Sequence, residues 1–333
     1  MLSKLSSSLR STLAVVAGCF FVNSAALAAS PAVERYPDQP VNMYLPFPAG
    51  GVTDATMRKI ADRFQALTGQ PMIIQNRPGR TNALSALVAA KPDGYTLSLV
   101  GRSQMITHWL LGDKMPFDPI NDFTWIDTLV TSWFGVFVAA DSPYQSVADL
   151  IEDARRNPEK IAYGTAFGVG GLTHAPMHQL AESQGVKMNY IPYKGDADSI
   201  RALMGGDVKA IVAAGSAMPY VESGRMRLLG WLSRVPHPKY PDVKTFKDMG
   251  YDVEAYSIVG LGGPKGMDPA LATKISSIFQ RILSEPETRE FMLGVFQNPE
   301  LSSPQAFRAW AEQQLDKERQ NLDAFGLLNS GAN

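Results

Sequence analysis

The chain has 333 residues, of which 45% are hydrophobic, and its 31 Lys and Arg residues nearly balance its 32 Asp and Glu residues. The formal net charge of −1 excludes the basic surface that a nucleic-acid partner or an anionic membrane would require. A chain of this length suits two domains, and its single cysteine, Cys19, excludes a disulfide framework.

The first 28 residues predict a secretory signal peptide. Lys4 and Arg10 supply the positive region, Leu13 to Val22 form a short apolar core, and Ala26-Leu27-Ala28 is a small-residue cleavage site. Cleavage there removes two positive charges, no acidic residue and Cys19, so the exported chain carries a net charge of −3 and no thiol. Val16-Ala17-Gly18-Cys19 also resembles a lipobox, which leaves a lipidated Cys19 as an alternative.

A glycine pair separates the first predicted strand from the first long predicted helix. The apolar run Val41–Leu45 is typical of a strand, and apolar residues recur at helical spacing through Ala55–Leu67. Between them lies Pro46-Phe47-Pro48-Ala49-Gly50-Gly51-Val52-Thr53-Asp54. Glycine lets a ligand approach the backbone, Thr53 is predicted as the helix N-cap, and Asp54 complements the helix dipole. The free N–H groups of the first helical turn predict an anion site, and a tight turn without a ligand is the alternative.

Strands and helices alternate along the rest of the chain. The predicted strands are Val41–Leu45, Met72–Gln75, Thr96–Val100, Trp125–Leu129, Gly135–Ala139, Ile161–Gly164, Met188–Ile191, Ala210–Ala213 and Leu228–Leu232. The predicted helices are Ala55–Leu67, Ala83–Ala90, Val147–Arg156, Ala175–Gln184, Ser199–Met204, Pro269–Ser284, Pro286–Phe296 and Pro304–Phe325. This alternation favours an α/β fold with parallel sheets and with binding sites at the carboxyl ends of strands.

An ordered set of motifs resembles the solute-binding proteins of tripartite tricarboxylate transporters, also called the Bordetella uptake gene family. The set begins with Pro-Phe-Pro-x-Gly-Gly-x-Thr-Asp at 46–54. It continues through Gln75-Asn76-Arg77-Pro78-Gly79, Lys91-Pro92-Asp93-Gly94-Tyr95-Thr96-Leu97, Pro116-Phe117-Asp118-Pro119, Ile191-Pro192-Tyr193-Lys194-Gly195 and Gly224-Arg225-Met226-Arg227. The resemblance covers nearly all of the chain after the signal peptide. It implies a two-lobed periplasmic binding protein-like fold of type II, each lobe a sheet flanked by helices, with the ligand cleft between the lobes.

The resemblance also implies how the chain divides. Residues 29–132 together with 255–333 would form a discontinuous first lobe, and residues 133–254 the second. The hinges are expected near Val130–Phe134 and Glu254–Tyr256, and the apolar run Ser257–Pro264 is expected to return to the first lobe as a strand.

A second glycine-rich loop has the same predicted position as the first, between a strand and a helix. Thr165–His174 follows the predicted strand Ile161–Gly164 and precedes a helix, so two such loops facing each other could clamp a carboxylate. Two independent turns are the alternative, and the resemblance favours the clamp. This loop is rich in Gly and Val where the family usually has Ser and Asn. Phe167 replaces the family's usual small residue and is expected to wall the pocket.

Other candidate site residues follow later strands. Arg102 comes just after Thr96–Val100, and its guanidinium could grip a distal carboxylate through two hydrogen bonds. Arg80 is a weaker candidate of the same kind, and a solvated surface arginine is the alternative for both. The predicted ligand-binding residues are Phe47, Ala49, Gly50, Gly51, Thr53, Asp54, Arg102, Ser103, Phe167, Gly168, Gly170, Gly171, Thr173, Gly215 and Ser216.

Catalytic and metal motifs are incomplete. His174 and His178 are four residues apart but lack the Glu and the third ligand of a zinc protease, and Gly215-Ser216 lacks the G-x-S-x-G elbow. The sequence therefore predicts no catalytic residue, no metal and no cofactor.

The resemblance implies a periplasmic, monomeric receptor. It would capture a small di-, tri- or aromatic carboxylate by closing its lobes, and deliver the ligand to the membrane permease subunits of a tripartite tricarboxylate transporter. A ligand-sensing receptor for a two-component kinase is an alternative, and an exported enzyme is a less favoured one.

Overall fold

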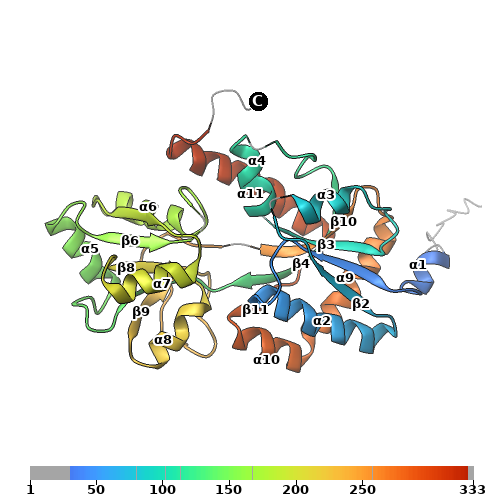
Figure 1. Ribbon diagram of the computed structural model, residues 1–333, viewed down its shortest axis with the longest axis horizontal. Coiled ribbons are helices and arrows are strands. Elements are labelled where there is room, and N and C mark those ends of the chain that lie inside the picture. Colours follow the sequence, from blue (N-terminus) through green and yellow to red (C-terminus); the bar gives the residue numbers. More distant parts are fainter. Residues whose placement is uncertain are drawn as a thin grey trace, which may run out of the picture.

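The computed structural model describes residues 31–79, 81–101, 103–112, 114–166, 168–256 and 258–328. Two β-sheets lie at opposite ends of an elongated molecule (Figure 1). The first, in spatial order β11-β4-β10-β3-β1-β2, consists of β1 (Val41–Leu45), β2 (Met72–Asn76), β3 (Thr96–Gly101), β4 (Phe123–Ser132), β10 (Ile258–Pro264) and β11 (Gln297–Pro299). The second, in order β7-β6-β8-β5-β9, consists of β5 (Gly135–Ala139), β6 (Ala162–Thr165), β7 (Asn189–Pro192), β8 (Ala210–Ala213) and β9 (Met226–Trp231).

Each sheet is parallel in one part and antiparallel in another. β1 pairs in parallel with β2 and β3, and β6 does so with β7 and β8. β10 is antiparallel to β3 and β4, and β5 is antiparallel to β8 and β9. The prediction of parallel sheets is therefore correct for the pairs made by β1 and β6 and wrong for the pairs made by β5 and β10. The antiparallel strands β5 and β10 enter directly from the other sheet, without the crossover helix that a parallel connection needs.

Helices cover both faces of each sheet. They are α1 (Pro31–Arg35), α2 (Val52–Thr68), α3 (Asn82–Val88), α4 (His108–Leu110), α5 (Val147–Arg156), α6 (His174–Ser183), α7 (Asp196–Gly205), α8 (Met218–Glu222), α9 (Pro269–Ser284), α10 (Pro286–Gly294) and α11 (Pro304–Ala324). A π-helical turn η1 (Ser103–Thr107) and a 3-10 turn η2 (Gly215–Ala217) precede α4 and α8. The predicted α/β fold of two sheets flanked by helices is confirmed.

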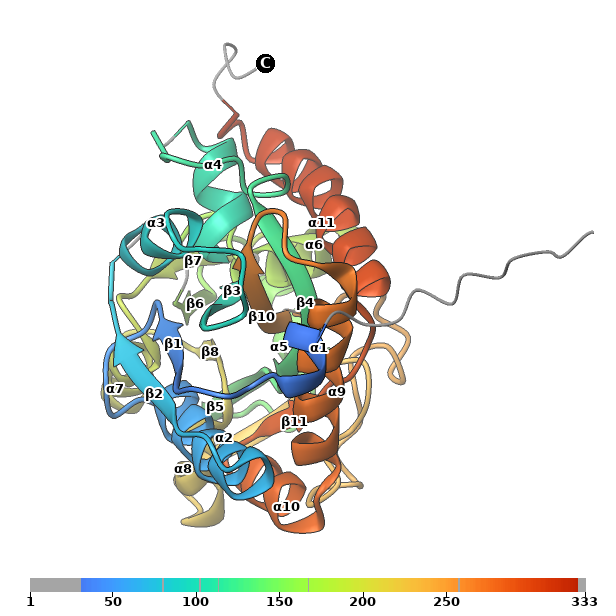
Figure 2. The same ribbon diagram turned by 90° about the vertical axis from the view of Figure 1, so that its right-hand side faces the viewer.

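The first sheet separates two apolar layers. On one side α2 and α9 bury Phe64 and Phe279, whose ring centroids are 6.1 Å apart. On the other side α3 and α11 bury Leu84, Leu87 and Phe307. Figure 2 shows α2 and α10 on the first side and α3 and α11 on the second. Burial of these side chains supplies the main favourable free energy of the lobe.

The second sheet is covered in the same way. α5 and α6 bury Leu150 and Leu180 in one apolar layer. α7 and α8 bury Leu203 and Met218 in the other. The second layer also contacts Leu293 and Phe296 from the end of α10, so it joins the two parts of the molecule.

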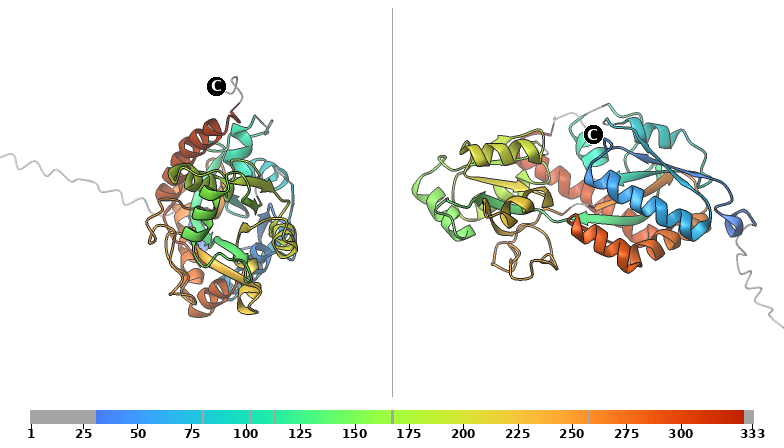
Figure 3. Two further views of the ribbon diagram at one scale, coloured as in Figure 1. Left: turned by 90° about the vertical axis from the view of Figure 1, so that its left-hand side faces the viewer. Right: turned by 60° about the horizontal axis from the view of Figure 1, so that its bottom comes forward.

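The chain passes between the sheets twice. β4 leads through Trp133 and Phe134 into β5, and the segment after β9 returns to β10 (Figure 3). Within the first predicted hinge, Val130, Thr131 and Ser132 belong to β4 and pair with β10 and β11, so only Trp133 and Phe134 of that range lie between the two sheets. The strands of the first sheet lie within 41–132 and 258–299 and those of the second within 135–231. The predicted lobe boundaries fall between these ranges and stay a prediction.

Every predicted strand and helix corresponds to an element of the structure, including the return strand, which is β10. The bounds of β1, β5, β8, α5 and α9 are as predicted. The elements α1, η1, α4, η2, α8 and β11 were not predicted. The helix predicted to reach Phe296 ends at Gly294, because Phe296 adopts a left-handed φ of 58° that redirects the chain into β11.

Candidate functional site

The first glycine loop connects β1 to α2. Its N-cap is Gly51, with an extended backbone and no side-chain capping bond, so the prediction of Thr53 as N-cap is wrong by two positions. The first helical bond runs from Ala55 N to Gly51 O over 3.0 Å. The N–H groups before Ala55 therefore have no carbonyl acceptor within the helix and form its positive end. Ala49, Gly50 and Gly51 are exposed, so this positive end opens to solvent.

Asp54 is turned into the protein, with only 4% of its surface exposed. Its carboxylate accepts hydrogen bonds from Gly50 N at 2.9 Å, Arg58 Nε at 3.0 Å and Asn76 Nδ2 at 2.9 Å. The bonds from Arg58 and Gly50 lower the pKa of Asp54 to about 2. Asp54 therefore stays ionised and fixes the loop to α2 and β2, because all three donors converge on one carboxylate.

Thr53→Ala and Asp54→Ala form a matched pair of substitutions in this loop. Thr53 makes no capping bond, so its loss should change the free energy of unfolding by less than about 0.5 kcal/mol. Asp54→Ala should cost about 1.5–3 kcal/mol, because three donors lose a charged acceptor. Urea denaturation at neutral pH measures both. Equal costs would mean that Asp54 does not hold the loop.

The second glycine loop connects β6 to α6. Gly168 and Gly170 have left-handed φ values of 74° and 71°, which favour glycine. Gly170 N donates to His174 Nδ1 at 2.8 Å, and Ala175 N donates to Gly171 O at 3.0 Å. The loop is thus held by a side chain of the helix that it precedes.

Thr173 faces the interior of this second loop. It is 1% exposed, and its hydroxyl is within 2.7 Å of Thr165 Oγ1 and 2.8 Å of Ala166 O. Gly168 is half-buried and Val169 is 47% exposed. Among the described residues of this loop, Gly168 and Val169, rather than Thr173, are therefore the ones at least partly exposed to solvent.

The two loops are alike in sequence and in hydrogen bonding. Residues 50–55 and 170–175 both read Gly-Gly-x-Thr-x-Ala. In each, the first glycine has a left-handed φ and its N–H donates to the side chain four residues later, which is Asp54 or His174. In each, the alanine N–H donates to the second glycine, Gly51 or Gly171. The shared spacing is present in the sequence, but the prediction from the glycines and the helix starts assigned Asp54 only to the helix dipole and did not identify Asp54 and His174 as the residues that fix the loops.

His174 is buried between aromatic rings. Its ring centroid lies 3.8 Å from that of Tyr190 and 4.7 Å from that of Phe325. Burial, and to a smaller extent the neighbouring His178, lower the pKa of His174 to about 4. The ring is therefore neutral near pH 7, which lets Nδ1 accept the Gly170 N–H.

The protein should lose stability between pH 6.5 and pH 4 because of His174. The unfolded chain binds a proton near pH 6.5 and the folded chain only near pH 4, so the contribution is complete above pH 6.5 and lost as the pH falls to about 4. The expected loss is about 3 kcal/mol. Burial also lowers the pKa of His237, so the measurement is the difference between wild type and His174→Asn across this range. Parallel pH profiles of the two proteins would contradict the assignment.

The contacts of Gly215 and Ser216 are with residues outside both glycine loops. An ideal Cβ on Gly215 would come within 2.2 Å of Phe296 Cβ, so the Phe296 side chain covers this glycine. Ser216 is exposed, and its hydroxyl donates to Asp196 Oδ2 at 2.6 Å. Both contacts are within the protein, and the predicted role of Gly215 and Ser216 in ligand binding stays a prediction.

The remaining predicted site residues are only partly described. Phe47 is half-buried, and its carbonyl accepts a hydrogen bond from Asn76 Nδ2 at 3.2 Å. Ser103 begins η1 at the end of β3. Arg80, Arg102 and Phe167 lie outside the described residues, as do the predicted signal peptide and Cys19.

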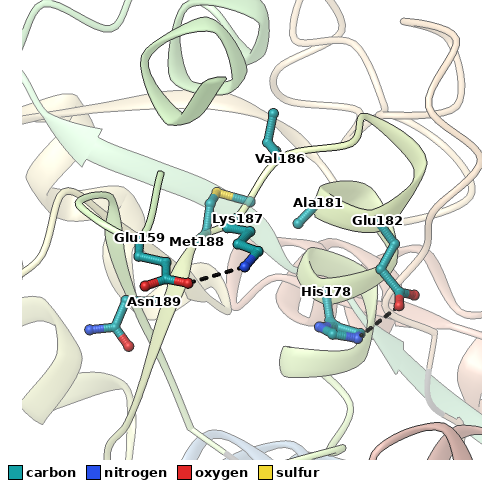
Figure 4. Close-up of a pocket in the computed structure, with 8 residues that line it drawn as sticks. All are labelled: Glu159, His178, Ala181, Glu182, Val186, Lys187, Met188 and Asn189. Atoms are coloured by element: carbon teal, nitrogen blue, oxygen red, sulfur yellow. Dashed lines mark hydrogen bonds and ion pairs between the residues drawn. The ribbon is translucent and has the colours of Figure 1, made fainter. Parts of the chain in front are cut away.

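A separate pocket of about 570 Å³ lies on the second lobe (Figure 4). His178 and Glu182 of α6 line one side, with 3.4 Å between His178 Nε2 and Glu182 Oε1. Lys187 and Glu159 form a second pair at 3.4 Å. The lining contains no predicted ligand-binding residue.

Across the described ranges, no cluster of three or more His, Cys, Asp or Glu residues could hold a metal ion. No helix in the same part of the chain is long and apolar enough to cross a membrane.

Comparison with known proteins identifies the family. A model described as the tripartite tricarboxylate transporter family receptor matches residues 56–327. The chain belongs to this receptor family. A relative from Cupriavidus necator, the UPF0065 protein in the gbd 5′ region, is 33% identical to this receptor over 308 residues, which are 92% of this chain and 93% of the relative.

Solved structures of the family share the fold of this receptor. The periplasmic binding protein BugD has 27% identity and a TM-score of 0.70, over 88% of this chain and 99% of BugD. The R. palustris protein Rpa4515, solved with adipate, has 26% identity and a TM-score of 0.73, over 87% of this chain and 98% of that protein. The predicted family and two-lobed binding-protein fold are confirmed.

Proposed function

We propose that this receptor is a monomeric periplasmic protein that binds a small organic carboxylate between its lobes and delivers it to the permease subunits of a tripartite tricarboxylate transporter. The signal peptide would direct export and be removed by cleavage after Ala28. The observation that carries the proposal is the pair of matching glycine loops, one preceding α2 and one preceding α6. Each loop precedes the positive end of a helix, where an anion is favoured.

The charges within the two loops support an anionic ligand held by backbone groups. Asp54 and His174 are the ionisable side chains of the loop segments 46–54 and 168–174, and both are buried and hydrogen-bonded within their own loop. Neither is available to bind a cationic ligand. A carboxylate can instead accept from N–H groups at the helix starts, and lobe closure would remove water from these bonds.

A dicarboxylate is the ligand class that we favour. The structural relative Rpa4515 was solved with adipate, a dicarboxylate, and its chain matches nearly all of this one. The backbone N–H groups of the two loops would bind one carboxylate group of such a ligand. Arg102 remains our proposal for the second, since a guanidinium pairs with a carboxylate through two parallel hydrogen bonds. The receptor would release its ligand chemically unchanged.

Thermal unfolding in the presence of adipate and of its neutral diamide tests this proposal. Adipate at about 100 times its dissociation constant should stabilise the folded protein by about 2.7 kcal/mol, and the diamide should not. Citrate and benzoate complete the panel, and chromatography of the recovered acid checks that it is unchanged. Equal stabilisation by adipate and its diamide would contradict the proposed anion site. Recovery of a chemically altered acid would show that the protein is an enzyme.

A further inference from the structure

Helix α11 belongs to the first lobe at its beginning. Phe307 lies edge-on to Trp125, with ring centroids 4.8 Å apart, and an ideal Cβ on Gly260 of β10 would come within 2.3 Å of the Phe307 ring. Phe307 and Ala311 are fully buried in the layer above the first sheet. This end of α11 is therefore fixed by the core of the first lobe.

The other end of α11 reaches the second lobe. In Figure 1 the dark red helix extends from the first sheet toward α6. Gln179 Nε2 of α6 donates to Asn321 Oδ1 at 3.3 Å. The ring centroid of Phe325 lies 4.7 Å from that of His174 and 4.6 Å from that of His178.

The residues at this end cover the second glycine loop. An ideal Cβ on Gly170 would come within 3.1 Å of Leu322, 3.3 Å of Leu327 and 3.4 Å of Phe325. These three apolar side chains thus lie directly over the glycine whose N–H is held by His174. Phe325 and Tyr190 both contact the His174 ring, which leaves it little room to turn away from Gly170.

We propose that Leu322, Phe325 and Leu327 act as a strap that fixes the second glycine loop in its ligand-binding conformation. The inference rests on the proposed function, because it assigns these side chains a role in binding at that loop. They are positioning residues, acting through Gly170 and His174. Because α11 is anchored in the first lobe, the strap also makes the second loop sensitive to the position of that lobe.

The substitution Phe325→Ala tests the strap, and Trp310→Ala is its matched control. Trp310 is an aromatic residue of the same helix whose ring packs on Phe307, 5.8 Å away, in the first lobe. Three quantities are measured in the full protein: the pKa of His174 by ¹⁵N NMR, hydrogen exchange at the Gly170 amide, and adipate affinity by calorimetry.

Phe325→Ala should raise the pKa of His174 toward its ordinary value, speed exchange at Gly170 and weaken adipate binding about two- to thirtyfold. Trp310→Ala should leave all three as in wild type, although it lowers thermal stability. An unchanged His174 pKa and Gly170 exchange in Phe325→Ala would overturn the strap, and so would altered loop readouts with unaltered adipate affinity. If wild type binds no carboxylate, the proposed function fails separately, and the two NMR readouts still decide whether the strap holds the loop.

Discussion

Gly51→Val should abolish carboxylate binding while leaving the protein folded. Gly51 has φ −79° and ψ 169°, a conformation that valine adopts readily, and an ideal Cβ would meet only Pro48 O at 3.8 Å. The fold therefore tolerates the side chain. The isopropyl group would instead occupy the space above the first N–H groups of α2, where we place the carboxylate. The stabilisation of about 2.7 kcal/mol expected with adipate at 100 times its dissociation constant should disappear.

Gly294 provides a control for this substitution, and Gly50 tests the backbone strain of the loop itself. Gly294→Val adds the same side chain at the end of α10, where an ideal Cβ has no neighbour within 4 Å, and should leave adipate binding intact. Gly50→Ala should cost about 1–2 kcal/mol of stability, because Gly50 has a left-handed φ of 83°. Circular dichroism establishes that each variant is folded. Normal binding by Gly51→Val would mean that the first loop is only a turn.

Gly215→Ala should destabilise the protein by about 1–3 kcal/mol through a clash with Phe296. The added Cβ would lie 2.2 Å from Phe296 Cβ and Cγ. Phe296 cannot easily yield, since its ring stacks on Tyr240 at 5.9 Å and lies 4.6 Å from the His237 ring. The clash falls where α10 of the first lobe meets the second lobe, so it should weaken the contact between them.

A double-mutant cycle with Phe296→Gly measures this clash, because glycine removes the Cβ as well as the ring. Removing both should relieve the strain, so the double variant should be more stable than the sum of the single changes predicts, by about 0.5–3 kcal/mol. Ser216→Ala is the neighbouring control, and it should cost only one exposed hydrogen bond to Asp196. Purely additive effects would show that Phe296 does not cover Gly215 in solution.

Local patterns sufficed for most of the fold. The apolar run Val41–Leu45 and the helical spacing in Pro269–Ser284 predict β1 and α9 with their observed bounds. The antiparallel direction of β5 and β10 depends on which sheet each strand enters, which no local pattern records. Strand β11 was missed because it is three residues long and follows a left-handed Phe296.

The site was harder to predict than the fold. A polar residue just before a helical pattern indicates an N-cap, and this led to Thr53, whereas the chain uses Gly51 and directs Asp54 inward to Gly50, Arg58 and Asn76. The bond from Asn76 depends on β2 lying beside β1, which is a tertiary fact, whereas Gly50 and Arg58 are each only four residues from Asp54. Gly215 is predicted to line the cleft because it follows β8, and the covering of this glycine by Phe296 depends on tertiary packing that the sequence does not record.

Amide chemical shifts of the two loops test the central claim most directly. In ¹H–¹⁵N spectra of the wild-type protein titrated with adipate, the amides of Gly51, Val52 and Thr53 should shift together with those of Gly168 and Val169, and saturate at one dissociation constant. The neutral diamide should shift neither group. Shifts confined to one loop, or absent from both while adipate still stabilises the protein, would contradict a carboxylate held between the two glycine loops.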